Sequence, residues 1–172
     1  MIRHIYTYQQ PFTFESGESI TNFEIVYHTP EKDWTAGDSR KVIWICHALT
    51  ANSDPEDWWS DLVGKGKLLD TEKCFIVCVN IPGSPYGTTS PASTNPETGK
   101  PYYFTYPAVT IRDIVKSEII IRKMVCYYYF IYICYTSYLY AVRWFCRQEK
   151  SNNIISKRSY YLKEGETLYE NM

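Results

Sequence analysis

The fold of this chain is decided by two short apolar runs, Val42-Ile43-Trp44-Ile45-Cys46 and Cys74-Phe75-Ile76-Val77-Cys78-Val79. Runs that are apolar at nearly every position are typical of strands buried on both faces of a parallel sheet. Parallel neighbours need a crossover, and Pro55 to Leu69 has room for a short helix with Asp54 as its N-cap. We therefore predict that residues 42–46 and 74–79 are adjacent parallel strands.

Two further elements flank these runs. Phe12-Thr13-Phe14, a polar turn around Gly17, and Phe23-Glu24-Ile25-Val26-Tyr27 predict a β-hairpin. A helix is expected to begin near Thr110 and to continue through Ile120, with Asp113 completing a capping box. A hairpin, a strand, a crossover, a second strand and a helix indicate the opening part of an α/β fold, with an incomplete sheet.

The composition changes sharply after residue 123. All 9 prolines precede that point, as do all but one of the 8 glycines, whereas more than half of the 17 tyrosines follow it. Globular domains place Gly and Pro at their turns, so we predict two regions of unlike origin, 1–123 and 124–172. The second is expected to be an unrelated, Tyr-rich and helical tail.

The origin of this tail is open to three interpretations: read-through of a frameshifted or interrupted gene, a membrane-associated segment in residues 124–142, or a selected fusion. The membrane interpretation is disfavoured because tyrosines lie throughout that segment, and tyrosine prefers the interface to the hydrocarbon centre.

Bulk properties exclude several classes of function. A formal net charge of -1 gives no reason to expect a nucleic-acid partner. The 6 cysteines form no Cys-x-x-Cys pair, and no histidine lies at metal-ligand spacing from them, so no metal site is expected. The first residues lack the apolar run of a signal peptide, so we expect a cytoplasmic protein with reduced thiols.

Two loops follow the predicted parallel strands, at the edge where α/β sheets place their ligands. In the first, His47-Ala48-Leu49-Thr50, a structural and a functional role are equally compatible with the sequence, and we expect His47 to satisfy a local hydrogen bond rather than to act as a base. The second runs from Asn80 to Tyr102 and is rich in Gly, Pro, Ser and Thr. Its length and lack of apolar periodicity favour a loop that shapes a site over a solvated surface loop.

Four motifs of this region occur in an order and spacing that resemble the homoserine O-acetyltransferase family of methionine biosynthesis. They are Cys46–Thr50, Asn80–Ser84, Ser90-Pro91 with Asn95–Tyr102, and Pro107–Asp113. The resemblance covers residues 1–123 and implies an α/β-hydrolase fold and a dimeric cytosolic acyltransferase. It also implies that acetyl-CoA and homoserine are the substrates, that an acyl-serine is the intermediate, and that no cofactor is bound. Some members of this family use succinyl-CoA, and residues 1–123 do not distinguish the two donors.

The resemblance carries over few site residues. It implies that the Leu49 backbone amide is an oxyanion-hole donor and that Thr50 and Arg112 line the pocket. The family continues into a Gly-Gly-Ser-x-Gly-Gly nucleophile elbow, but this sequence contains no Gly-x-Ser-x-Gly, and Ser137 lies between Thr136 and Tyr138.

All 3 histidines precede residue 123, whereas the family's catalytic histidine comes last. We therefore predict a truncated acyltransferase that lacks the catalytic triad, is inactive by itself, and is prone to form homo-oligomers or aggregates. The alternative is a non-catalytic fragment that associates with a full-length relative or, through residues 124–142, with a membrane.

Overall fold

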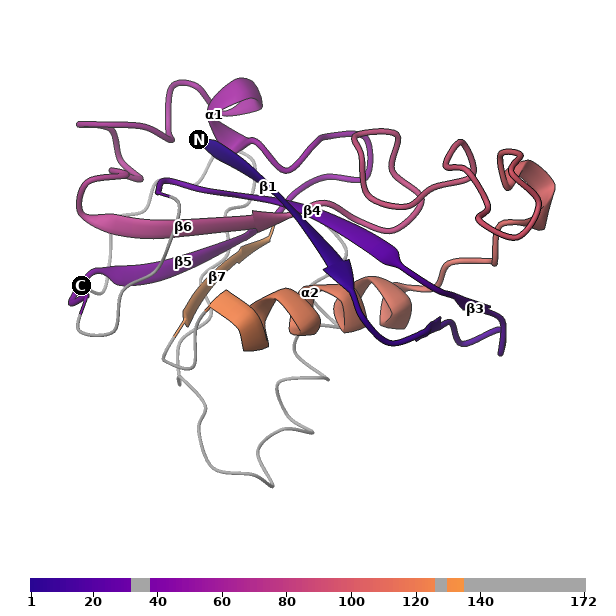
Figure 1. The fold of residues 1–172 in the computed structure, drawn as a ribbon. Helices are drawn as coiled ribbons and strands as arrows, with labels where there is room; N and C mark the ends of the chain where they lie inside the picture. Colours follow the sequence, from indigo (N-terminus) through magenta and orange to yellow (C-terminus); the bar gives the residue numbers. More distant parts are fainter. Residues whose placement is uncertain (32–37, 126–129, 135–172) are drawn as a thin grey trace.

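The computed structural model describes residues 1–31, 38–125 and 130–134, which form a five-stranded mixed sheet, a small two-stranded sheet and few helices (Figure 1). The strand order is β1-β4-β6-β5-β7. These strands are β1 (Ile2–Tyr8), β4 (Phe23–Thr29), β5 (Lys41–Cys46), β6 (Cys74–Val79) and β7 (Phe130–Cys134). The pairs β1–β4 and β4–β6 are antiparallel, whereas β5 pairs in parallel with both β6 and β7.

The two runs that decide the fold form β5 and β6, as predicted, and they are parallel neighbours in which Ile43 lies opposite Ile76. Residues 42–46 and 75–79 are all buried. Alternate side chains enter two separate hydrophobic clusters: Trp44 and Val77 belong to one, and Ile45 and Ile76 to the other. Burial on both faces explains why neither run alternates between polar and apolar residues.

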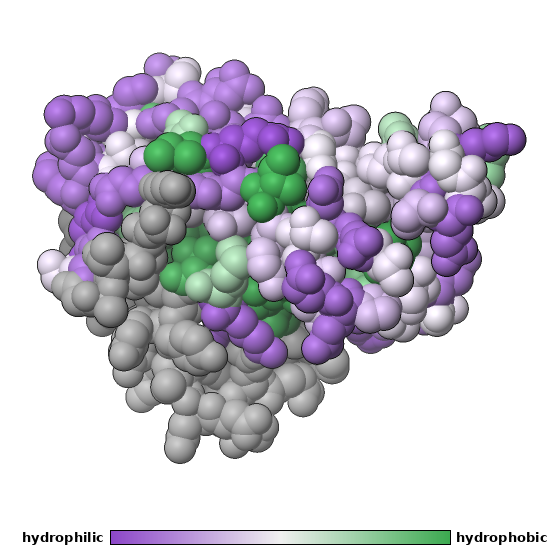
Figure 2. All heavy atoms as spheres, in the orientation of Figure 1, coloured by the Kyte–Doolittle hydropathy of each residue, from purple (hydrophilic) through white to green (hydrophobic). Residues whose placement is uncertain are grey.

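Each face of this central pair is covered. On one face lies α2 (Ile111–Val125), whose Ile121 is fully buried in the first cluster. On the other face lie α1 (Pro55–Trp58) and the loop that leads to Leu69. On the face shown in Figure 2, hydrophobic residues form separate patches among hydrophilic ones. An incomplete sheet was expected to leave one face of these apolar strands without cover, but both faces of β5 and β6 are covered by described residues.

The predicted N-terminal hairpin is correct in its turn but wrong in its second arm. The pairing partners are β2 (Phe12–Thr13) and β3 (Ser19–Ile20), joined by a turn in which Gly17 adopts a φ of 91°. Asn22, at a φ of 53°, then redirects the chain into β4, which pairs with β1 instead. The strand β1 was not predicted because this edge strand has no buried residue and shows no clean alternation.

The predicted crossover helix is a single turn. Asp54 caps α1 as expected, since its carboxylate accepts a hydrogen bond from the Glu56 N–H at 3.2 Å. The remainder of the crossover is built from turns, because Gly64 and Gly66 both adopt positive φ, at 135° and 72°. These two glycines prevent the apolar residues around Val63 from continuing a helix.

The expectation of a helical tail holds for residues 124–125 but is wrong for residues 130–134. The helix α2 continues past residue 123 to Val125, and residues 130–134 form the strand β7. Phe-Ile-Tyr-Ile-Cys is rich in aromatic and β-branched residues, which favour strands. The predictions on residues 126–129 and 135–172, Ser137 included, lie outside the described residues. No helix in the described ranges is long and apolar enough to cross a membrane.

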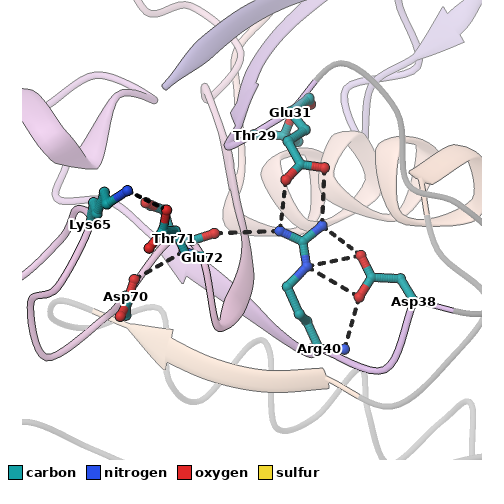
Figure 3. A network of polar contacts seen from close by, with 8 residues as sticks. All are labelled: Thr29, Glu31, Asp38, Arg40, Lys65, Asp70, Thr71 and Glu72. Carbon is teal, nitrogen blue, oxygen red and sulfur yellow. Dashed lines mark hydrogen bonds and ion pairs between the residues drawn. The ribbon is translucent and has the colours of Figure 1, made fainter.

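A polar network centred on Arg40 joins three segments at the amino ends of the parallel strands (Figure 3). Its guanidinium donates to both carboxylate oxygens of Glu31 at 2.9 and 3.1 Å, to Asp38 and to the carbonyl of Thr71. The group also lies 5.5 Å from the centre of the Phe75 ring. The hydrogen bonds that Arg40 donates to Asp38 and Glu31 raise the pKa of its guanidinium, so this cation is permanently charged.

We expect the substitution Arg40→Ala to lower the free energy of unfolding by about 1–2 kcal/mol, because it removes several charge-assisted hydrogen bonds at once. Arg40→Lys should recover only part of this loss, since an ammonium lacks the planar fork that reaches both carboxylates. Lys65→Ala is the matched control, because its ion pair with Glu72 is exposed. Urea unfolding of the three variants measures the difference, and equal effects of Arg40→Ala and Lys65→Ala would contradict this prediction.

Candidate functional site

The candidate site lies at the carboxyl ends of the parallel strands. The last pair in the β5–β7 register is Cys46 with Cys134, so both strands end side by side. The loop that follows β5 begins at His47, and the loop that follows β6 begins at Asn80. In α/β sheets this edge is where ligands bind, because the loops of neighbouring strands converge there.

A tight turn directly after β5 presents two backbone donors. The Ala51 N–H donates to the Ala48 carbonyl at 2.9 Å and closes the turn. Among the residues that the structure describes, neither Leu49 nor Thr50 donates its N–H to another group. Both residues are exposed, Leu49 at 71%. Unpaired N–H groups on a fixed turn are the donors that stabilise the oxyanion of an acyl-transfer reaction.

His47 lies beneath this turn and is only 1% exposed. Its Nδ1 is 2.7 Å from the Ala48 carbonyl oxygen, which confirms the predicted local hydrogen bond. Burial lowers the pKa of His47, and its contacts with the Ala48 carbonyl and the Asn80 side chain oppose this only partly. The imidazole is therefore neutral at physiological pH.

The loop from Asn80 to Pro91 is built into the sheet. The Thr88 hydroxyl accepts a hydrogen bond from the Val26 N–H at 3.0 Å, and the Thr89 hydroxyl accepts one from Glu24 at 2.8 Å. The Thr89 N–H in turn donates to the Glu24 carbonyl at 2.9 Å. These threonines hydrogen-bond to the edge of β4 beyond the end of β6, so this part of the loop is fixed to the sheet. Its role in shaping a site stays a prediction.

Arg112 is held by an ion pair at the start of α2. Its guanidinium donates to Glu15 at 2.6 Å on the exposed side of the β2–β3 turn. The neighbouring Asp113 is buried and accepts hydrogen bonds from the N–H groups of Glu15 and Thr110, both at 2.9 Å. The Asp113 N–H also donates to the Thr110 hydroxyl at 3.3 Å, which confirms the predicted capping box. The role of Arg112 as a pocket residue stays a prediction.

Sequence reasoning missed a buried contact between Ser53 and His28. The Ser53 hydroxyl is 2.9 Å from His28 Nδ1, and the Asp54 carboxylate is 3.9 Å from Nε2 of the same ring. Ser53 is 1% exposed, so its hydroxyl is closed to substrate and the arrangement is structural. No spacing motif signals it, because 25 residues separate the serine from the histidine. The described ranges also hold no group of three or more His, Cys, Asp or Glu side chains that could bind a metal ion.

The loop beyond Pro91 contains one strained residue. Tyr103 opens a short 3-10 helix, η1 (Tyr103–Thr105), and adopts a φ of 44°, while its N–H donates to the Pro91 carbonyl at 2.7 Å. A non-glycine residue in this region costs about 1–2 kcal/mol. The hydrogen bond to Pro91 holds the residue in this conformation.

We expect Tyr103→Gly to stabilise the protein by about 0.5–1 kcal/mol, since glycine removes the strain but adds freedom to the unfolded chain. Tyr86→Gly is the matched control, because Tyr86 is also partly exposed and its φ is not positive. That substitution should destabilise the protein. Thermal unfolding followed by circular dichroism measures both changes, and a loss of stability in Tyr103→Gly would contradict the argument.

Comparison with known proteins supports the resemblance over the first two thirds of the chain. A homoserine O-acetyltransferase of Cyclobacterium marinum is 43% identical over 117 residues, which are 68% of this chain and 33% of that protein. One from Trichormus variabilis is 46% identical over 108 residues, 63% of this chain and 30% of that protein. The chain thus spans about a third of the length of the curated relatives it matches. No protein-family model matches it.

Solved structures agree on the fold. A homoserine O-acetyltransferase from Bacillus anthracis superposes with a TM-score of 0.68 at 23% identity, covering 93% of this chain and 46% of that one. Esterase E22 superposes with a TM-score of 0.61 at 26% identity, covering 77% and 40%. Both are α/β-hydrolases, so the mixed sheet described above is part of an α/β-hydrolase fold.

Proposed function

We propose that this chain supplies the oxyanion side of an acyl-transfer site of the homoserine O-acetyltransferase type. The carrying observation is the turn after β5, where the Leu49 and Thr50 N–H groups have no partner among the described residues and lie next to the end of β7. Similarity to curated homoserine O-acetyltransferases over the segment that contains this turn supports the assignment. L-Homoserine and acetyl-CoA are then the substrates, with acetyl-CoA consumed as the acyl donor and not bound as a cofactor.

The chemistry follows from the geometry of the turn. A thioester carbonyl under attack develops negative charge on its oxygen, and fixed N–H donors stabilise that charge without reorganisation. In α/β-hydrolases the second donor is the residue after the nucleophile, which follows a neighbouring strand of the sheet. The pairing of the last residues of β5 and β7, next to the Leu49 turn, supports the assignment of β7 as that neighbouring strand.

The chain by itself is proposed not to complete the reaction. Its sequence contains no Gly-x-Ser-x-Gly elbow, and the Ser53–His28 contact is closed to substrate. The test incubates the purified chain with acetyl-CoA and L-homoserine and follows the release of free thiol. We expect no acetylation above background, and acetylation that one Ser→Ala substitution abolishes would overturn the proposal of inactivity.

The role of the Leu49 amide is tested in a chimera, in which residues 1–123 replace the matching segment of the Cyclobacterium marinum relative. Leu49→Pro deletes the N–H, and we expect kcat to fall by about 10²–10³-fold, as for the loss of one oxyanion donor. Leu49→Ala retains the N–H and should keep kcat within a few-fold. Equal losses in the two variants would show that the side chain, and not the amide, matters.

A further inference from the structure

We propose that His47 and Asn80 are a positioning pair that aims the Leu49 N–H into the acyl-transfer site. The function of the pair rests on the proposed function above, but its geometry is tested independently of turnover. His47 and Asn80 directly follow the parallel neighbours β5 and β6, and both are buried, at 1% and 0% exposure. Three of their side-chain atoms, His47 Nε2 and both amide atoms of Asn80, have no hydrogen-bond partner among the described residues.

The first step of the argument is the orientation of one peptide group. A carbonyl oxygen only accepts, so the 2.7 Å contact with the Ala48 oxygen requires the proton of His47 to lie on Nδ1. In a trans peptide the C=O and N–H groups point in opposite directions, and the described residues contain no cis peptide bond. Because the imidazole holds the Ala48 carbonyl, the N–H of the same peptide, that of Leu49, points away from the buried ring.

The second step concerns the strength of that donor. The Ala48 carbonyl accepts twice, from His47 and from the Ala51 N–H at 2.9 Å. Hydrogen bonds in a chain polarise one another, so a peptide whose carbonyl is doubly engaged has a more acidic N–H. The arrangement therefore fixes the direction of the Leu49 N–H and also strengthens it as a donor.

The third step assigns the role of Asn80. With its proton on Nδ1, His47 presents an unprotonated Nε2 that needs a donor, and a buried acceptor without one is costly. The Asn80 side chain contacts the ring, and its backbone is anchored by hydrogen bonds to Val26 at 2.8 Å and from Thr88 at 3.3 Å. The Asn80 side-chain amide lies beside the ring and has no partner among the described residues, so we assign it as the donor that holds this tautomer.

The test uses the complete 172-residue chain labelled with ¹⁵N. The imidazole nitrogen shifts report the tautomer directly, and we expect a neutral ring with its proton on Nδ1 throughout the neutral pH range. In Asn80→Ala we expect a mixture of the two neutral tautomers, because Nε2 then lacks its neighbouring donor. A ring protonated on Nε2 in the unsubstituted chain would overturn the proposal without any variant.

Two substitutions at His47 separate positioning from packing. His47→Leu removes the donor to Ala48, and we expect the Leu49 amide resonance to shift and its hydrogen exchange to change several-fold. His47→Asn places an N–H near the position of Nδ1 and should restore both signals. If the Leu49 amide resonance and its exchange rate are the same in all three chains, and each chain has native circular dichroism, the positioning role of the pair is overturned. Because no step measures turnover, an inactive chimera would count against the proposed function and not against the pair.

Discussion

Raising the pH from about 4.5 to about 8 is expected to remove up to about 5 kcal/mol from the free energy of unfolding through one side chain, Glu118. This residue of α2 is buried against Cys46 of β5, with 3.9 Å between the thiol sulfur and the carboxyl oxygen. Burial raises the pKa of Glu118 from 4.5 to about 8, and hydrogen bonds involving Trp44 and Cys46 oppose that rise only partly.

The sign follows from proton linkage. In the unfolded chain Glu118 ionises near its ordinary pKa of 4.5, whereas in the folded chain it keeps its proton until about pH 8. Between these values unfolding releases a proton, so a higher pH favours the unfolded state. The stability that Glu118 contributes is therefore fully present below pH 4.5 and is lost as the pH rises to about 8.

Urea unfolding at a series of pH values measures this effect. Glu118→Gln cannot ionise and should flatten the profile, while the exposed Glu24→Gln should leave it unchanged. Burial also lowers the pKa of His28 and of His47, so these two residues destabilise the fold only as the pH falls below about 6.5. The decline in the free energy of unfolding between pH 6.5 and 8 therefore reports on Glu118. An identical slope in Glu118→Gln and the unsubstituted chain would rule out this assignment.

The substitution Phe12→Ala is expected to lower the free energy of unfolding by about 3–5 kcal/mol, the range for removing a buried phenylalanine. Phe12 is fully buried, stacks on Phe23 at 4.3 Å between ring centres and meets Phe14 edge-on at 4.9 Å. The ammonium of Lys116 lies 4.7 Å from the same ring. The variant therefore loses aromatic contacts on several sides and leaves a cavity between the β2–β3 hairpin and α2.

Phe104 provides the matched control, because it is the same residue type and is fully exposed. Phe104→Ala should change the free energy of unfolding by less than about 0.5 kcal/mol. Both variants are compared by urea unfolding at one pH. If Phe12→Ala proved as mild as Phe104→Ala, the hairpin would not be part of the cooperative core.

The elements predicted from sequence are those whose pattern is independent of distant partners. The strands β5 and β6 and the helix α2 have unbroken apolar runs or a capping box, and these were located correctly. The pairing of β4 was missed because register depends on tertiary contacts, here with the exposed strand β1. The strand β7 was missed because the scarcity of Gly and Pro outweighed the strand propensity of its own five residues.

The candidate site was predictable only in its position along the chain. The end of the strand that became β5 indicated the loop His47–Thr50 as a candidate, and the family resemblance implied the roles of Leu49 and Thr50. The proximity of Asn80 to His47, and of Ser53 to His28, arises only when separate loops meet, and no local pattern encodes it. The ion pair of Arg112 with Glu15 was not predictable either, because 97 residues separate the two in the sequence.

The pairing of β5 with β7 also has a consequence for biosynthesis. On the ribosome β5 finds β6 soon after it emerges, but its other edge stays open until residues 130–134 have been made. At ordinary rates of about 5–20 residues per second, that interval lasts several seconds. An open edge of hydrophobic sequence on a nascent chain is a target for chaperones and for neighbouring nascent chains. We therefore expect the yield of native protein to fall when slow codons are placed between residues 80 and 134, because they prolong the vulnerable state.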